Sequence, residues 1–273
     1  MPVMSRSRPR GAAATGTTPG DAFADPSASI LGSMTLDKLW DWTGGSPLAD
    51  WYLHDAAAGN DPSNGERSGP KPANVSVIDD TSCMGNKCLD LLLRRETYDG
   101  YPLSGVQMEA AGFVWGVGSP FYAEVRIKWP SYLGAWVGPW FLQFPTSPNR
   151  EMDIMETINF RGPKTTCHSP SIATQDYGPS TNDEDWHRYG MKVTSTDIKW
   201  YYEETARSGV MTHVLTHSNA TNANLFEDAS MFAKIQHFAG GSFPEFDNGG
   251  PIADGDLPTS DKHFYCDYIR VYN

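Results

Sequence analysis

The sequence lacks the long apolar runs and the excess of positive charge that membrane proteins and nucleic-acid-binding proteins need. No stretch approaches the roughly 20 apolar residues of a bilayer-spanning helix. Lys and Arg total 21 against 33 Asp and Glu, which gives a formal net charge of −12. Such a charge opposes contact with phosphate backbones and anionic lipids. We therefore expect neither nucleic acid nor a membrane as a partner.

Cysteines are also few. The four cysteines neither form a disulfide-dense scaffold nor show C-x-x-C metal spacing. Cys83 and Cys88 are close enough in sequence for a local disulfide in an oxidising compartment, and two reduced, buried thiols are the equal alternative.

The N-terminal residues lack the apolar core of about 7–15 residues that a secretory signal contains. Residues 1–29 are instead rich in Ala, Gly, Thr and Pro, with three arginines near the start. We interpret residues 1–29 as a disordered arm and residues 30–273 as one folded domain, and we expect a monomer.

Sustained helical periodicity is almost absent. The 26 Gly and 20 Pro are spread along the chain and separate short segments of alternating polarity, which is typical of a β-sandwich. The segment from Phe121 to Trp129 alternates and ends at Pro130, and the segments 197–203 and 263–272 are similar. We predict an all-β sandwich in which helix is confined to a turn or two near residues 33–39.

Three carboxylates stand close together in an apolar segment. Glu151, Asp153 and Glu156 alternate with Met and Ile, which makes a poor solvated face. In a regular strand Glu151 and Asp153 share one face while Glu156 lies on the other. A β-bulge between Asp153 and Glu156 would bring all three onto one surface, and bulges are frequent beside active sites. An exposed acidic strand face and a metal site are the alternatives.

The spacing of these acids suits glycoside hydrolysis. Strand steps of about 3.3 Å place the backbones of Glu151 and Glu156 roughly 13 Å apart. Their side chains can close most of this gap and approach the roughly 5–5.5 Å carboxyl separation of retaining glycosidases. The charge of Asp153 between them would raise the pKa of a neighbouring glutamate or share a proton with it.

The motif Glu-x-Asp-x-x-Glu in this apolar setting resembles the bulged active-site strand of glycoside hydrolase family 16. Further segments are similar to that family in the same order, namely residues 116–130, 134–142, 186–190, 198–202 and 267–272. The resemblance covers roughly Leu36 to Asn273 and is weakest before Leu103. It implies a β-jelly roll of two antiparallel sheets with a concave substrate cleft.

The resemblance also implies roles for the three acids. Glu151 corresponds to the nucleophile, Asp153 to the assisting acid and Glu156 to the general acid/base. Arg150 and Thr157, on either side, depart from the family pattern, and these departures concern the substrate more than the chemistry. The chain is therefore interpreted as an endo-acting, retaining β-glycanase, with a non-catalytic, lectin-like module as the alternative of another class.

Aromatic side chains are expected to carry the sugar rings, because these rings present apolar C–H faces. Trp136 and Trp140 are the first candidates and Trp115 a weaker one, with ordinary core packing as the alternative for each. Arg126 is a candidate for a substrate hydroxyl or for a structural ion pair. His168 is a candidate for hydrogen bonding to the catalytic region or for a surface position.

The expected substrate is β-1,3-glucan, with a red-algal galactan as the alternative. The bulged motif resembles enzymes acting on β-1,3-glucan of the laminarin type and enzymes acting on red-algal galactans, namely agarose, porphyran and carrageenan. The net charge favours neutral glucan, whereas a cationic cluster of Arg94, Arg95, Arg150 and Arg161 would favour a charged galactan. Because a polysaccharide substrate is large, we expect an extracellular or periplasmic location. No cofactor is expected, although the resemblance implies a structural calcium ion with Asp267 as candidate ligand.

Overall fold

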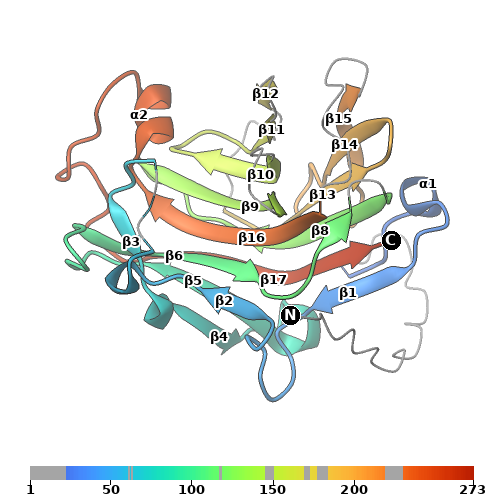
Figure 1. The fold of residues 1–273 in the computed structure, drawn as a ribbon, viewed down its shortest axis with the longest axis horizontal. Helices are drawn as coiled ribbons and strands as arrows, with labels where there is room; N and C mark the ends of the chain where they lie inside the picture. Colours follow the sequence, from blue (N-terminus) through green and yellow to red (C-terminus); the bar gives the residue numbers. More distant parts are fainter. Residues whose placement is uncertain are drawn as a thin grey trace.

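Two sheets of mainly antiparallel strands lie one over the other (Figure 1). The computed structural model describes residues 23–60, 62, 64–116, 119–144, 151–168, 173–176, 184–218 and 230–273. No helix in these ranges is long and apolar enough to cross a membrane. The predicted all-β sandwich is confirmed.

The first sheet contains the three strands that the alternating segments predicted. Its strands, in spatial order, are β15 (Thr212–Ser218), β14 (Asp197–Tyr202), β13 (His187–Val193), β8 (Phe121–Lys128), β17 (Lys262–Tyr272), β5 (Lys87–Leu93) and β4 (Val75–Asp79), and β1 (Leu36–Trp40) pairs with β17. β8, β14 and β17 therefore lie where sequence alternation placed strands.

The second sheet has the acidic segment among its inner strands. Its strands, in spatial order, are β12 (Ala173–Asp176), β11 (Lys164–His168), β10 (Glu151–Ile158), β9 (Ala135–Phe144), β16 (Ser230–Ala239), β6 (Leu103–Ala110) and β2 (Trp51–Leu53), while β3 (Ser68–Pro70) pairs with β6 and β7 (Trp115–Gly116) with β16. The strand β10 is thus flanked on both sides, by β9 and β11.

The hydrophobic core lies between the two sheets. Val125 from the first sheet and Ala233 and Ile235 from the second belong to one buried cluster. Because side chains alternate along a strand, Lys234 and Gln236 of β16 are directed to the opposite face of the second sheet. That outward face is where the polar residues of the site gather.

In the part of the chain that the structure describes, helix is limited to short segments: α1 (Ala28–Leu31), α2 (Ser242–Asn248) and the 3-10 turns η1 (Ala56–Ala58), η2 (Pro72–Asn74) and η3 (Met84–Asn86). The prediction of helix near residues 33–39 is wrong. Leu36–Trp40 forms β1 instead, because pairing with β17 satisfies its backbone and Trp40 packs against Trp51 with ring centroids 5.0 Å apart.

The packed part of the chain begins earlier than residue 30. Ala24 is buried, and its carbonyl accepts a hydrogen bond of 2.6 Å from Nη2 of Arg270. The Tyr272 hydroxyl donates to Oδ1 of Asp25 at 2.7 Å. Residues 23–29, which were assigned to the disordered arm, therefore include residues that pack on the domain, and residues 1–22 lie outside the described residues.

Arg126 and Asp267 form a buried ion pair on the first sheet, away from the acidic strand. The Arg126 guanidinium also lies 4.9 Å from the ring of Trp186. Arg126 therefore has the structural role that was its alternative, and its assignment to substrate is corrected. Asp267 also accepts a hydrogen bond of 2.6 Å from the backbone of Met84, so protein groups already occupy the carboxylate expected to bind calcium.

All four cysteines are free and buried. The Cys88 thiol donates to the backbone carbonyl of Leu89 at 3.3 Å. The reduced alternative therefore describes this structure.

Candidate active site

The acidic strand β10 contains the predicted bulge. Its register with β11 shifts between Asp153 and Glu156, and its register with β9 shifts between Asp153 and Thr157. Two successive side chains, Ile154 and Met155, both lie in the core between the sheets. The extra residue turns Glu156 onto the face that carries Glu151 and Asp153.

A glycine on the neighbouring strand leaves room for this bulge. A Cβ atom on Gly138 of β9 would lie 2.7 Å from the carbonyl oxygen of Met155 and 3.4 Å from Cγ of Glu156. Any side chain at Gly138 would therefore push the bulge away. The sequence held a signal for this residue, since glycine inside a strand often marks a close backbone approach.

The three acids line a hollow of about 520 Å³ on the outward face of the second sheet. Its other lining residues come from several strands, from α2 and from the connection between η1 and β3: Pro62, Asn64, Glu66, Gln107, Trp136, Gly138, Trp140, Leu142, His168, Lys234, Gln236, Phe238, Ser242 and Phe243. This lining brings Trp136, Trp140 and His168 beside the acids, as the sequence predicted.

Burial and the negative charge of neighbouring acids raise the pKa values of Glu151 and Asp153. Burial, followed by the negative charge of Glu156, raises the pKa of Glu151 to about 7. Burial, followed by the charges of both glutamates, raises the pKa of Asp153 well above its ordinary value, and Asp153 is only 1% exposed. Hydrogen bonds from the protonated Asp153 in turn lower the pKa of each glutamate. Asp153 can therefore act as a proton-bearing bridge between them.

Glu156 is held by two donors. Nε1 of Trp136 donates to Oε1 at 2.8 Å, and the Thr166 hydroxyl donates to Oε2 at 3.4 Å. Burial raises the pKa of Glu156, and these two hydrogen bonds oppose the rise because they stabilise the anion. Trp136 is thus a hydrogen-bond donor to Glu156 as well as part of the wall of the hollow.

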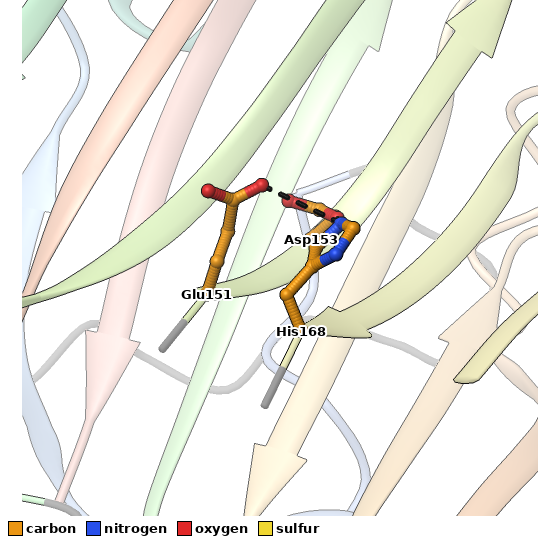
Figure 2. Close-up of side chains that lie close together, drawn as sticks. All are labelled: Glu151, Asp153 and His168. Carbon is orange, nitrogen blue, oxygen red and sulfur yellow. Dashed lines mark ion pairs between the residues drawn. The ribbon is translucent and has the colours of Figure 1, made fainter. Parts of the chain in front are cut away.

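His168 lies on β11 directly opposite Glu151. Figure 2 shows its ring and the carboxyl groups of Glu151 and Asp153 pointing toward one another. Nε2 is 3.6 Å from Oε1 of Glu151 and 3.5 Å from Oδ2 of Asp153, and burial lowers the pKa of the imidazole. The three side chains could also hold a metal ion, since their ligand atoms lie within 4.8 Å of one another.

The remaining predicted site residues have other positions. Trp115 is buried in the core, and its Nε1 donates to Oδ2 of Asp37 at 2.9 Å. Its assignment to substrate is therefore corrected to core packing, because β7 directs the indole between the sheets. Arg150 lies outside the described residues.

No protein-family model matches the chain. Among curated proteins it is 28% identical over 204 residues to the clotting factor G alpha subunit of Tachypleus tridentatus, covering 67% of this chain and 27% of that protein. It is 29% identical over 206 residues to the endo-1,3-1,4-beta-glycanase EglC of Rhizobium meliloti, covering 72% of this chain and 39% of that protein. The chain thus spans less than half of either relative.

Solved structures are similar over most of the chain. The laminarinase catalytic domain from Thermotoga maritima matches with a TM-score of 0.69 at 22% identity, covering 88% of this chain and 98% of that one. SCLam, a non-specific endo-beta-1,3(4)-glucanase from family GH16, matches with a TM-score of 0.67 at 20% identity, covering 94% and 96%. The chain has the fold of glycoside hydrolase family 16. The predicted jelly roll and the resemblance to this family are confirmed at that level.

Within this family 16 fold, α2 contributes wall residues that the sequence did not reveal. Phe243 packs on Trp136 with ring centroids 5.9 Å apart. The helix is tied to the end of β10 by Asn159, whose Nδ2 donates to the Pro244 carbonyl at 3.0 Å and to Oδ2 of Asp247 at 2.9 Å. Because α2 and β10 are far apart in the sequence, no local pattern predicted this contact between them.

The Trp136→Phe variant is expected to raise the pH at which activity falls on the alkaline side. Loss of the Nε1 donor removes a bond that stabilises the Glu156 anion, so the pKa of Glu156 rises. The variant keeps an aromatic ring in the wall. The measurement is kcat/KM against pH, and Trp140→Phe is the matched control. An unchanged pH for the alkaline fall of kcat/KM would contradict this role of Trp136.

Proposed function

We propose that the chain is an endo-acting, retaining β-glycanase that hydrolyses internal β-linkages of a polysaccharide, with β-1,3-glucan as the first substrate class. The observation that carries this proposal is the bulge that turns Glu151, Asp153 and Glu156 onto one face of a hollow. The names of the similar proteins, a beta-glycanase and laminarinases among them, support it.

Hydrolysis follows two displacements. The carboxylate of Glu151 attacks the anomeric carbon while the bond to the leaving oxygen breaks, and Glu156 transfers its proton to that oxygen. Glu156, now a carboxylate, takes a proton from water; the water oxygen bonds to the anomeric carbon and Glu151 is released. The protonated Asp153 stabilises each glutamate in its anionic state by hydrogen bonding. No cofactor takes part in these steps.

The described arginines favour a neutral substrate over a charged galactan. Arg94 pairs with Asp261 at 3.0 Å, and Arg161 pairs with Asp247 at 3.0 Å. Nη1 of Arg95 donates to the carbonyl of Asp254 at 2.7 Å. None of the three lines the hollow, so the cationic cluster that would have favoured galactan has no counterpart among the described residues.

The test is a reducing-end assay against laminarin, mixed-linkage glucan, agarose, porphyran and carrageenan in parallel. Laminarin is expected to be cut, with internal cleavage visible as a rapid fall in viscosity. Activity on a red-algal galactan with none on laminarin would replace the first substrate class by the second. Binding of a polysaccharide without cleavage of any would favour the lectin-like alternative. We also propose that the protein acts as a monomer outside the cytoplasm, where such polymers are found.

The first product is expected to keep the β-configuration at its new reducing end. Two successive inversions at the anomeric carbon give net retention, whereas direct attack by water gives the α-anomer. Proton NMR at early time, before mutarotation, measures the ratio of anomers. Initial release of the α-anomer would exclude Glu151 as nucleophile.

A further inference from the structure

A row of paired side chains leads from the catalytic strand across the second sheet. Asp153 is opposite Trp140, Trp140 is opposite Lys234, and Lys234 is opposite Glu109. Neighbouring strands are about 4.8 Å apart, so the backbone of Lys234 lies roughly 10 Å from that of Asp153. A polysaccharide that reaches from the acids along this row therefore passes over Trp140 and Lys234.

Lys234 is a buried cation in the wall of the hollow. Its side chain is 9% exposed, and its ammonium lies 4.6 Å from the ring centroid of Trp140. Burying an ammonium is unfavourable unless the charge is paired. The pairing carboxylate, Oε2 of Glu109, is 3.6 Å away, which is longer than a hydrogen bond. The ammonium can therefore still donate N–H groups to a ligand.

Glu109 is the anionic half of this pair. Nε2 of His54 lies 3.1 Å from its Oε2, and hydrogen bonding to His54 and the charge of Lys234 lower the pKa of Glu109. The Glu109 side chain is 29% exposed. Its carboxylate is therefore ionised, held by His54 and partly exposed beside Lys234.

We propose that Trp140, Lys234 and Glu109 form a sugar subsite for an uncharged hexose unit of the substrate. The ring of Trp140 takes the apolar face of the sugar, the Lys234 ammonium donates to one hydroxyl, and the Glu109 carboxylate accepts from the neighbouring hydroxyl. Two adjacent hydroxyls offer an acceptor and a donor, which an ammonium–carboxylate pair matches. The inference rests on the proposed function and narrows its substrate class.

The charges of the residues around the subsite favour an uncharged sugar over a sulfated or uronic one. The ammonium of Lys234 already has a counter-ion in Glu109. Among the described lining residues Lys234 is the one Lys or Arg, facing four acids, Glu66, Glu151, Asp153 and Glu156. A sulfate or carboxylate on the sugar would have to compete with Glu109 for the ammonium.

The test replaces Lys234 by Met, which keeps the apolar stem but removes the charge and the donors. On laminarin, KM is expected to rise about 10-fold or more, as for loss of a charged hydrogen bond, with kcat within about 3-fold of wild type. Glu109→Gln is expected to raise KM in the same direction, and Lys234→Arg to recover part of the loss. Lys38→Met is the matched control, because Lys38 also pairs with a carboxylate, Asp50 at 2.6 Å, and lies over Trp40, outside the hollow.

Binding separates failure of the subsite from failure of the proposed function. A Glu151→Gln background is titrated by calorimetry with a β-1,3-linked glucose hexasaccharide, a neutral agarose hexasaccharide and a sulfated carrageenan hexasaccharide. Weaker binding of a neutral sugar in Lys234→Met supports the subsite, even if wild type hydrolyses no glucan. An unchanged KM and dissociation constant in an active enzyme would overturn the subsite alone. Binding of only the sulfated sugar, or of none, would also overturn it.

Discussion

Glu151→Gln is expected to lower kcat on the hydrolysed glucan by at least about 10³-fold, because an amide cannot form the glycosyl-enzyme intermediate. The side chain is 23% exposed and lies opposite His168 in the hollow, so the isosteric amide is accommodated. Steady-state rates from reducing ends measure the loss.

Glu156→Gln is expected to cost about 10²–10⁴-fold, since it removes the proton donor to the leaving oxygen. The loss should be much smaller for formation of the intermediate from a substrate with a strongly acidic leaving group, which needs no proton. Comparison of laminarin with an aryl β-glycoside therefore assigns the acid role.

Glu66→Gln is the matched control for both variants. Glu66 lines the same hollow but lies outside β10, and its Oε2 accepts from the backbone of Asn64 at 2.8 Å. The kcat of the Glu66→Gln variant should stay within about 10-fold of the wild-type value. Near-native rates in both β10 variants would show that these acids do not perform the reaction.

Glu124→Ala is expected to lower the free energy of unfolding by about 3–5 kcal/mol, because it removes the buried carboxylate nearest to the buried Arg270. Glu124 is fully buried on β8. Its Oε1 accepts from Nη2 of Arg270 at 2.6 Å and from the Tyr268 hydroxyl at 2.8 Å, while Nη1 of Arg188 lies 3.8 Å away. Urea unfolding followed by tryptophan fluorescence measures the loss.

The same glutamate makes stability depend on pH. The charges of Arg270 and Arg188 hold the pKa of Glu124 below its ordinary value in spite of burial. A carboxyl with a lowered pKa in the folded state stabilises the protein above its unfolded pKa, and this contribution is lost as the pH falls. The variant should therefore show less loss of stability on acidification than wild type.

Asp79→Ala is the control, since Asp79 and Lys87 form an exposed pair of the same first sheet, and it is expected to change stability little. Equal losses in Glu124→Ala and Asp79→Ala would contradict the importance of burial.

The sequence alone determined the strand pattern, the family resemblance and the three acids. Each depends on near neighbours in the chain. Alternation of side chains predicted β8, β14 and β17, and the parity of Glu151, Asp153 and Glu156 required the bulge that the structure contains. Such patterns are readable because backbone geometry sets which side chains share a face.

Only the tertiary structure decided which side chains accompany the acids. Lys234 and Gly138 reach β10 through the pairing of β16 with β9 and of β9 with β10, which no local pattern specifies. Trp115 and Arg126 have the residue types of a sugar site, yet one packs in the core and the other pairs with Asp267 on the first sheet. Residue type states what a side chain can do. What the side chain contacts depends on which distant strands pair and on whether it lies on the core face or the outward face of the sheet.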